Sequence, residues 1–426
     1  MKIRSAIETS GKKVRIKNIS RRVQKIVISP IKEMSILADE WQEKTGADII
    51  SFGQGIPWWD TPLNIKQGIK KALSETDTSK YTLEPGITKL RVLIAKFLEK
   101  EKKINKVRPK DEVMVTVGCQ EAIVCALAAI MDEGDEILLL EPGFASHIEQ
   151  IIQFGGKPVF VPLREKNGAP RGVGALRGWH FDIKACEKKI TKKTKAILFS
   201  NPSNPTGMVL TKKEILDIGH LAIKHNLIII TDETYDFLTY DGVKHISPAS
   251  FPNLRERVIL CGSFSKKYAL TGYRVGFAYA DSGLIYHMLK VHDALAICAP
   301  AISQKAAIAA LSGSQTSVKE SIGRFVKQRD MMCRELDTLS DILEYEKPMG
   351  AYYILAKVKR PTINSFELVL KILHEANVIV IPGAAFGPSG EGHIRFSFAG
   401  KPADITRGFV RLRKWAKKWQ ADGYKL

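Results

Sequence analysis

The chain has 426 residues, of which 45% are hydrophobic and 26% charged, and its formal net charge is +20. This composition is typical of an ordinary soluble globular protein, and the length predicts one large α/β unit with a second, smaller domain. No apolar run approaches the length that spans a bilayer, which excludes a membrane-embedded protein and argues against a membrane partner.

Much of the positive charge lies in two segments, at the start and near the end of the chain. Residues 1–30 contain nine Lys and Arg residues against the single acid Glu8, and residues 407–418 are again basic. Such charge could attract nucleic acid, or it could belong to a solvated arm and a charged helix face. Because neither interleaved aromatic residues nor a nucleic-acid motif accompanies the charge, we favour the second interpretation and expect no nucleic-acid partner.

A helix is predicted first, because apolar residues recur at helical spacing from Pro30 to Lys44. Residues 48–52 are predicted to be extended, and a loop rich in Gly and Pro follows from Gly53 to Pro62.

Short apolar runs separated by helical stretches then predict the strands of a sheet. They lie at 113–117, 136–140, 158–161, 196–199, 227–230 and 258–260. This alternation indicates a mostly parallel sheet covered on both faces, and such sheets bind ligands at the C-terminal ends of their strands. Residues 164–179 are rich in Gly, Arg and Pro without a period, so we expect a surface loop there.

The pattern changes beyond residue 312. A long helix is followed by strands at 352–355 and 394–397 and by a closing helix from Ala403. These elements indicate a second domain.

The six cysteines are scattered along the chain. They are Cys119, Cys125, Cys186, Cys261, Cys298 and Cys333. No two of them stand at the short spacing of a metal site or a redox pair, so we expect reduced thiols, a cytoplasmic protein and no metal centre.

The most informative stretch runs from Ser263 to Gly276. It places Lys266 among small hydroxyl residues, with Arg274 eight residues further on. A lysine that forms a Schiff base must reach a carbonyl without bulky neighbours, and hydroxyl and guanidinium groups suit the phosphate of an aldehyde cofactor. Pyridoxal 5′-phosphate is that cofactor. A Ser-Lys pair alone would be ordinary surface sequence.

The whole stretch is similar, position for position, to the cofactor-lysine signature of class I and II aminotransferases, the fold-type I pyridoxal-phosphate enzymes. The resemblance covers roughly residues 21–415. It implies a large cofactor-binding domain at 63–312 with a mostly parallel sheet. It also implies a smaller α+β domain from both chain ends, with the N-terminal arm and first part at 1–62 and the remainder at 313–426.

Other candidate contacts follow predicted strands. Gly118, Cys119 and Gln120 come after the strand at 113–117 and begin a helix, so their backbone amides could hold a phosphate. Asp232 follows the strand at 227–230, where a buried carboxylate needs a cationic partner such as a protonated pyridine nitrogen. A helix N-cap is the alternative interpretation of Asp232.

The resemblance implies a role for each cofactor residue. Asp232 keeps the ring nitrogen protonated, and Tyr235 donates a hydrogen bond to the phenolic oxygen. Asn204 contacts the same oxygen near the substrate carboxylate. Phe144 stacks on the pyridine, unless it serves core packing. Ser263 and Arg274 bind the phosphate.

The resemblance also implies a partner and a substrate. Tyr81 matches the tyrosine that reaches the phosphate of the neighbouring subunit, which implies a homodimer. Arg395 matches the arginine that pairs with the α-carboxylate of the amino acid, with a structural ion pair as the alternative. Gly55 would let the backbone approach the same carboxylate.

We therefore expect an aminotransferase that moves an amino group from an L-amino acid to a 2-oxo acid. The expected donor is aspartate, alanine or an aromatic amino acid. The alternative is a lyase or an aminocyclopropane-carboxylate-synthase-like enzyme with the same cofactor. A DNA-binding regulator of this fold is disfavoured, because the roughly twenty residues before Arg21 are too few for a winged helix.

Overall fold

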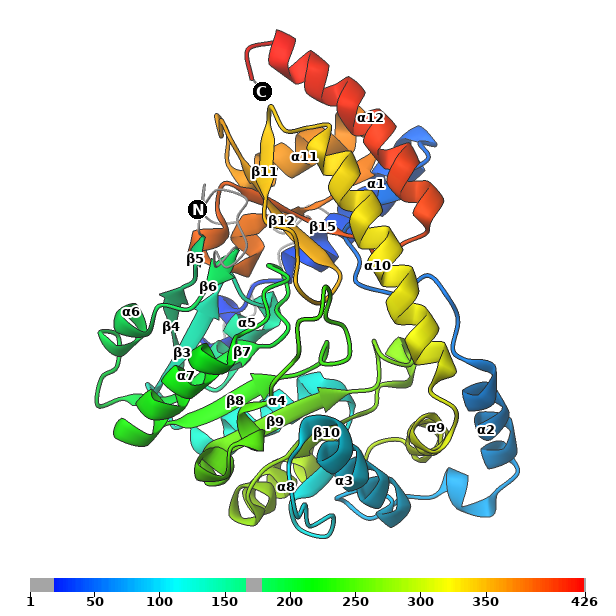
Figure 1. Cartoon of the computed structure of the whole chain (residues 1–426), viewed down its shortest axis with the longest axis vertical. Coiled ribbons are helices and arrows are strands. Elements are labelled where there is room, and N and C mark those ends of the chain that lie inside the picture. The colour runs from blue at the N-terminus through cyan, green and yellow to red at the C-terminus, as the bar shows by residue number, and fades with distance from the viewer. Residues whose placement is uncertain (1–18, 166–177, 425–426) are drawn as a thin grey trace.

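The computed structural model describes residues 19–165 and 178–424, and its largest element is a seven-stranded sheet covered by helices (Figure 1). The strand order is β2-β10-β9-β8-β7-β3-β4. The strands are β2 (Val113–Thr116), β3 (Glu136–Glu141), β4 (Lys157–Pro162), β7 (Thr194–Ser200), β8 (Ile228–Asp232), β9 (Val258–Ser263) and β10 (Gly276–Tyr279). Strand β10 runs antiparallel to β2 and β9, and the other described strand pairs of this sheet are parallel. The predicted α/β fold with a mostly parallel sheet is confirmed.

Both faces of this sheet are buried, because successive strand residues join two different hydrophobic clusters. In β3, Leu138 and Leu140 belong to the cluster that contains side chains of α3, α7 and α9, whereas Ile137 and Leu139 belong to that of α4, α5 and α8. Continuous apolar runs are what such two-sided burial requires. The helices of this part are α2 (Leu63–Leu73), α3 (Thr88–Lys102), α4 (Gly118–Ile130), α5 (Ala145–Gln153), α6 (Ile183–Glu187), α7 (Lys212–Lys224), α8 (Ser282–Ala296) and α9 (Ala301–Ser312).

A smaller sheet packs with helices from both ends of the described chain. Its antiparallel strands are β11 (Leu343–Tyr345), β12 (Tyr353–Val358), β15 (His393–Ser397) and β14 (Ile381–Pro382), in that order. Strand β1 (Ile50–Ser51) pairs in parallel with β13 (Val378–Ile379). One hydrophobic cluster joins α1 (Pro30–Thr45), α10 (Thr316–Asp337), α11 (Ser365–Ala376) and α12 (Pro402–Ala421). The domain boundaries near residues 62 and 312 stay a prediction.

The structure differs from the sequence prediction in three local features. Strand β10 was not expected from the sequence, and in the structure it pairs with both β2 and β9. The extended segment 48–52 is shortened to β1. The expected loop 164–179 begins with β5 (Arg164–Glu165) and ends with β6 (Trp179–His180), which pair with each other, while its residues 166–177 lie outside the described residues.

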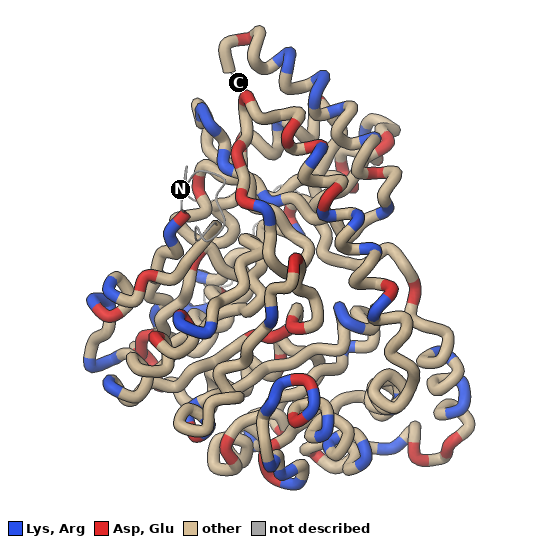
Figure 2. Tube along the Cα trace, in the orientation of Figure 1, with Lys and Arg blue, Asp and Glu red and all other residues tan. Residues whose placement is uncertain are grey.

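The basic C-terminal stretch lies on α12 and is partly neutralised there. Arg407 and Arg411 pair with Asp48, and Arg413 pairs with Glu335. Figure 2 shows Lys and Arg interspersed with Asp and Glu over the described helices. This pattern agrees with a charged helix face. Residues 1–18 of the basic arm lie outside the described residues, and none of the described helices is long and apolar enough to span a membrane.

Candidate active site

A cavity of about 1140 Å³ lies at the C-terminal ends of β7, β8 and β9, where a parallel sheet is expected to bind a ligand. Residues from the N-terminal segment 23–36 and from the smaller sheet complete its walls. Most of the predicted site residues line it, namely Gly55, Cys119, Gln120, Phe144, Asn204, Asp232, Tyr235, Ser263, Lys266, Arg274 and Arg395. Gly118 lies against Arg274, whereas the side chain of Tyr81 is 78% exposed and outside the described lining.

Lys266 reaches into this cavity from the turn that follows β9. Its Nζ donates a hydrogen bond to the carbonyl oxygen of Gly55, at 2.5 Å. Burial lowers the pKa of Lys266 to about 8, and the positive charges of Arg274 and Arg395 act in the same direction. A lysine with such a pKa supplies a neutral, nucleophilic amine near physiological pH.

An anion-binding corner lies beside Lys266. Helix α4 begins at Gly118 (φ +78°), and the first N–H groups of a helix lack partners within it. Arg274 covers this turn closely, because a Cβ on Gly118 would lie 2.7 Å from Nη2 of Arg274. The hydroxyl of Ser263, which accepts a hydrogen bond from the backbone N–H of Ser265 at 3.1 Å, lines the same cavity. Together these groups suit a phosphate.

Asp232 ends β8 and presents a buried carboxylate to the cavity. Its Oδ1 accepts a hydrogen bond from the backbone N–H of Thr234 at 3.0 Å, and its Oδ2 lies 3.5 Å from Nε2 of His147. Burial raises the pKa of Asp232, but contacts with His147 and Thr234 outweigh burial and lower the pKa overall. Among the described residues, neither Lys nor Arg forms an ion pair with Asp232, so the carboxylate can meet a cationic ligand group. The helix N-cap interpretation is wrong, because a turn and not a helix follows Asp232.

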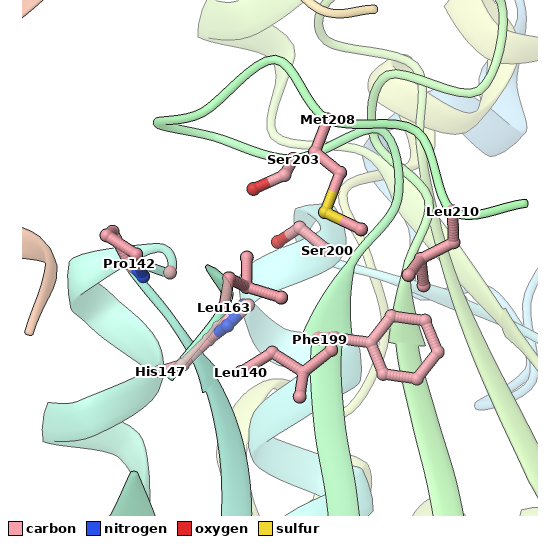
Figure 3. Close-up of a pocket in the computed structure, with 10 residues that line it drawn as sticks. Leu140, Pro142, His147, Leu163, Phe199, Ser200, Ser203, Met208 and Leu210 are labelled. Atoms are coloured by element: carbon pink, nitrogen blue, oxygen red, sulfur yellow. The ribbon is translucent and has the colours of Figure 1, made fainter. Parts of the chain in front are cut away.

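His147 is a site residue that sequence reasoning missed. It lies on α5 with a fully buried side chain, and Figure 3 shows it among Leu140, Leu163 and Ser200. The ring of Phe144, at the start of α5, lies 5.4 Å from that of His147. A histidine on the apolar face of a helix was the available signal, but ordinary cores also contain such residues.

Arg395, on β15, lies in the wall formed by the smaller sheet and is 1% exposed. Its Nη1 donates a hydrogen bond to Oδ1 of Asn204 at 3.0 Å, and its Nη2 donates one to the carbonyl oxygen of Gly53. The Nε of Arg395 is buried without a partner, and no carboxylate of residues 19–165 or 178–424 pairs with this guanidinium. The structural ion-pair alternative is therefore wrong within the described chain. A buried guanidinium group that lacks a carboxylate partner within the described chain suits an anionic ligand.

Two tyrosines that sequence reasoning also missed hold these groups in place. The hydroxyl oxygens of Tyr353 and Tyr235 are 2.8 Å apart, and the guanidinium carbon of Arg395 lies 4.5 Å from the ring centre of Tyr353. Tyr352 donates a hydrogen bond to the carbonyl oxygen of Gly55 at 2.7 Å. A Cβ at Gly55 would lie 1.9 Å from the hydroxyl oxygen of Tyr353, so no side chain fits there. Adjacent tyrosines are ordinary strand residues and gave no distinct signal.

A second cluster, outside the cavity, contains the atom types of a metal site. Candidate ligand atoms of Glu121, Cys125 and His292 lie within 4.8 Å of one another. The carboxylate of Glu121 lies 3.0 Å from Nδ1 of His292 and accepts a hydrogen bond from the backbone N–H of Val117 at 2.5 Å. These contacts involve Glu121 and His292 but not the thiol of Cys125, and the expectation of no metal centre stays a prediction. All six cysteines are free thiols.

Known proteins resemble this chain over most of its length. A family model described as aminotransferase class I and II matches residues 47–412. An aspartate aminotransferase of Pyrococcus abyssi is 37% identical over 86% of this chain and 91% of its own length. An aromatic-amino-acid aminotransferase of Thermococcus litoralis is 35% identical over 94% of this chain and 98% of its own length. The solved structure of an alanine aminotransferase from Pyrococcus furiosus matches with a TM-score of 0.86 and 31% identity over 94% of this chain and all of that chain.

The lowered pKa of Lys266 predicts the pH dependence of its reactivity. Reductive methylation of Lys266 by formaldehyde and cyanoborohydride should rise with pH and level off above about pH 8 in the folded protein, because the neutral amine is the nucleophile. In urea-unfolded protein, methylation of Lys266 should level off only near pH 10.5, the ordinary pKa of a lysine side chain. Peptide mass spectrometry measures both curves, and coincident curves would contradict the prediction.

Proposed function

This chain belongs to the class I and II aminotransferases, and on that premise we propose that its cavity binds pyridoxal 5′-phosphate and transfers the amino group of an L-amino acid to a 2-oxo acid. The observation that carries the proposal is the place of Lys266, between an anion-binding corner and the buried Arg395, which has no acidic partner among the described residues. These three features match an aldehyde, a phosphate and an amino-acid carboxylate.

The residues of the cavity fit this cofactor. The contacts we propose are residues 118–120, Ser263 and Arg274 for the phosphate, Asp232 for the pyridine nitrogen, Tyr235 and Asn204 for the phenolic oxygen, and Phe144 for the ring face. The fit is supported by the carboxylate of Asp232, whose lowered pKa keeps it ionised opposite a protonated nitrogen.

When bound, this cofactor supplies an electron sink for the electron pair that the substrate Cα releases as it loses a proton. The neutral Nζ of Lys266 would take that proton from Cα, and the resulting ammonium group would deliver it to the cofactor carbon that is bonded to the amino nitrogen. Arg395 and Asn204 orient the α-carboxylate, so that the Cα–H bond faces Lys266. The same residues perform the reverse half-reaction on the 2-oxo acid.

The relatives named above act on aspartate, aromatic amino acids and alanine, and we propose one of these as the amino donor. Besides Lys266, Arg274 and Arg395, the described lining contains one further cation, Lys32. Within the described part of the chain, Lys32 is therefore the cation left for the acidic side chain of a donor.

We also propose a homodimer in which Tyr81 contributes to the phosphate site of the partner subunit. Its side chain and that of nearby Leu83 are 78% and 68% exposed. Large exposed apolar and aromatic side chains are typical of surfaces that a second subunit covers.

Borohydride reduction of the holoenzyme should fix the cofactor to Lys266. Peptide mapping should find one modified peptide, because Lys266 combines access to the cavity with a pKa lowered to about 8. Lys266→Ala should lose turnover. Modification of another lysine, or full turnover in Lys266→Ala, would contradict the assignment.

Arg395→Ala should lower kcat/KM for aspartate, alanine and phenylalanine by similar factors. Loss of a buried charge-assisted contact costs about 2 to 5 kcal/mol, which corresponds to roughly 30-fold or more in kcat/KM. The absorbance spectrum of the bound cofactor should stay nearly unchanged, and Arg395→Lys should keep part of the activity. If only the acidic donor were affected, Arg395 would bind the substrate side chain instead.

The shared site predicts complementation between two inactive proteins. Tyr81→Ala and Lys266→Ala each damage both sites of a homodimer, but a mixed dimer has one site with an intact Lys266 and an intact Tyr81. Random mixing should restore about a quarter of wild-type activity, since half of the dimers are mixed and each has one intact site. No gain on mixing, with subunit exchange verified by mass spectrometry, would place Tyr81 outside the partner's site.

A further inference from the structure

Three of the site residues are each followed by a charged residue that lies outside the cavity. Asp232 is followed by Glu233, Tyr235 by Asp236 and Lys266 by Lys267. The first residue of each pair lines the cavity, whereas the second does not. The second residues gather behind the cavity instead, around the C-terminal end of α3.

Lys102, the last residue of α3, is the centre of this group. Its Nζ lies 2.8 Å from Oε2 of Glu233 and also pairs with Asp236. The side chains of Lys102 and Glu233 are 3% and 0% exposed. Ser247 donates a hydrogen bond to the other carboxylate oxygen of Glu233 at 2.6 Å, and Nε2 of His245 lies 3.5 Å from Oε2. We call Lys102, Glu233, Asp236 and Lys267 the buried ion cluster.

Lys267 joins the cluster through a shared aromatic ring. The Nζ atoms of Lys267 and Lys102 lie 4.4 and 5.9 Å from the ring centre of Phe97, which is also on α3. Although burial opposes the charged forms, Asp236 and Glu233 raise the pKa of Lys102, and Lys102 and Lys267 lower the pKa of Asp236. Burial lowers the pKa of His245 to about 4, so this histidine is neutral and adds no charge.

A buried ion cluster of this kind is a poor source of stability, because removing charges from water costs about as much as their attraction returns. The cluster instead restricts the positions of its members, because the carboxylates of Glu233 and Asp236 must both stay close to the ammonium group of Lys102. Here those carboxylates sit next to Asp232 and Tyr235 in one short turn, at residues 232–236.

We propose that Lys102 is a positioning residue, which holds the turn 232–236 so that Asp232 and Tyr235 face the cofactor ring. This inference rests on the proposed function. The polar partners of Lys102 are Glu233 and Asp236, and none of its recorded hydrogen bonds or ion pairs reaches Gly118, Ser263 or Arg274, so we expect the effect at the ring end of the cofactor.

The test compares Lys102→Met with Arg329→Met. Arg329 is also a buried cation (1% exposed side chain) held by two acids, Asp241 and Asp330, but none of these residues lines the cavity. The dissociation constants of pyridoxal phosphate and of inorganic phosphate are measured by calorimetry on each apoenzyme, together with the melting temperature and the kcat and KM of each holoenzyme.

In Lys102→Met we expect the dissociation constant of pyridoxal phosphate to rise about tenfold, because contacts to charged ring atoms are misplaced. The dissociation constant of inorganic phosphate should stay within about twofold of the wild-type constant. The kcat should fall with little change in KM. Arg329→Met should lower the melting temperature but leave pyridoxal phosphate affinity and kcat unchanged. Equal pyridoxal phosphate affinity in the two variants would overturn the proposal.

If Lys102→Met does not fold, Glu233→Gln carries the same test, because it keeps the side-chain length and removes one charge of the cluster. The same selective loss of pyridoxal phosphate affinity is expected, and wild-type affinity would overturn the proposal. Wild-type protein that binds no pyridoxal phosphate would overturn the proposed function and this inference together. Wild-type binding with unchanged variants would overturn the inference alone.

Discussion

The parallel pairing of β7, β8 and β9 is the constraint on which the site depends. In this register Ser200 of β7 lies beside Asp232 of β8, and Asp232 lies beside Cys261 near the end of β9. Parallel strands that end at one edge bring their following residues together, although these residues are far apart in the sequence. The cavity, with the lysine-bearing turn after β9, forms at this edge.

Adjacent residues at this edge of the sheet have different surroundings. Asp232, Tyr235 and Lys266 line the cavity, whereas the residues that follow them belong to the buried ion cluster. The same turn therefore carries a site residue and its support at adjacent positions. Such an arrangement lets α3, which does not line the cavity, influence how Asp232 and Tyr235 are presented.

The remaining wall comes from the two ends of the chain. Arg395 on β15 donates hydrogen bonds to Asn204, which follows β7, and to Gly53, which follows β1. Tyr352 and Lys266 both donate to the carbonyl oxygen of Gly55. The hydrogen bonds at Gly53 and Gly55 tie the N-terminal loop to the large sheet and to the smaller sheet. A movement of either part would change the geometry around Lys266.

The sequence by itself determined the α/β class, most strands of the large sheet and most of the candidate residues that line the cavity, because apolar periodicity and the motif around Lys266 are local signals. Only the tertiary structure decided which partners these residues meet. The contact between Lys102 and Glu233 joins positions 131 residues apart, and that between Tyr235 and Tyr353 joins positions 118 apart. His147 and strand β10 were missed for the same reason. The role of His147 arises from its place beside Asp232, and β10 is recognised as a strand by its pairing with β2 and β9.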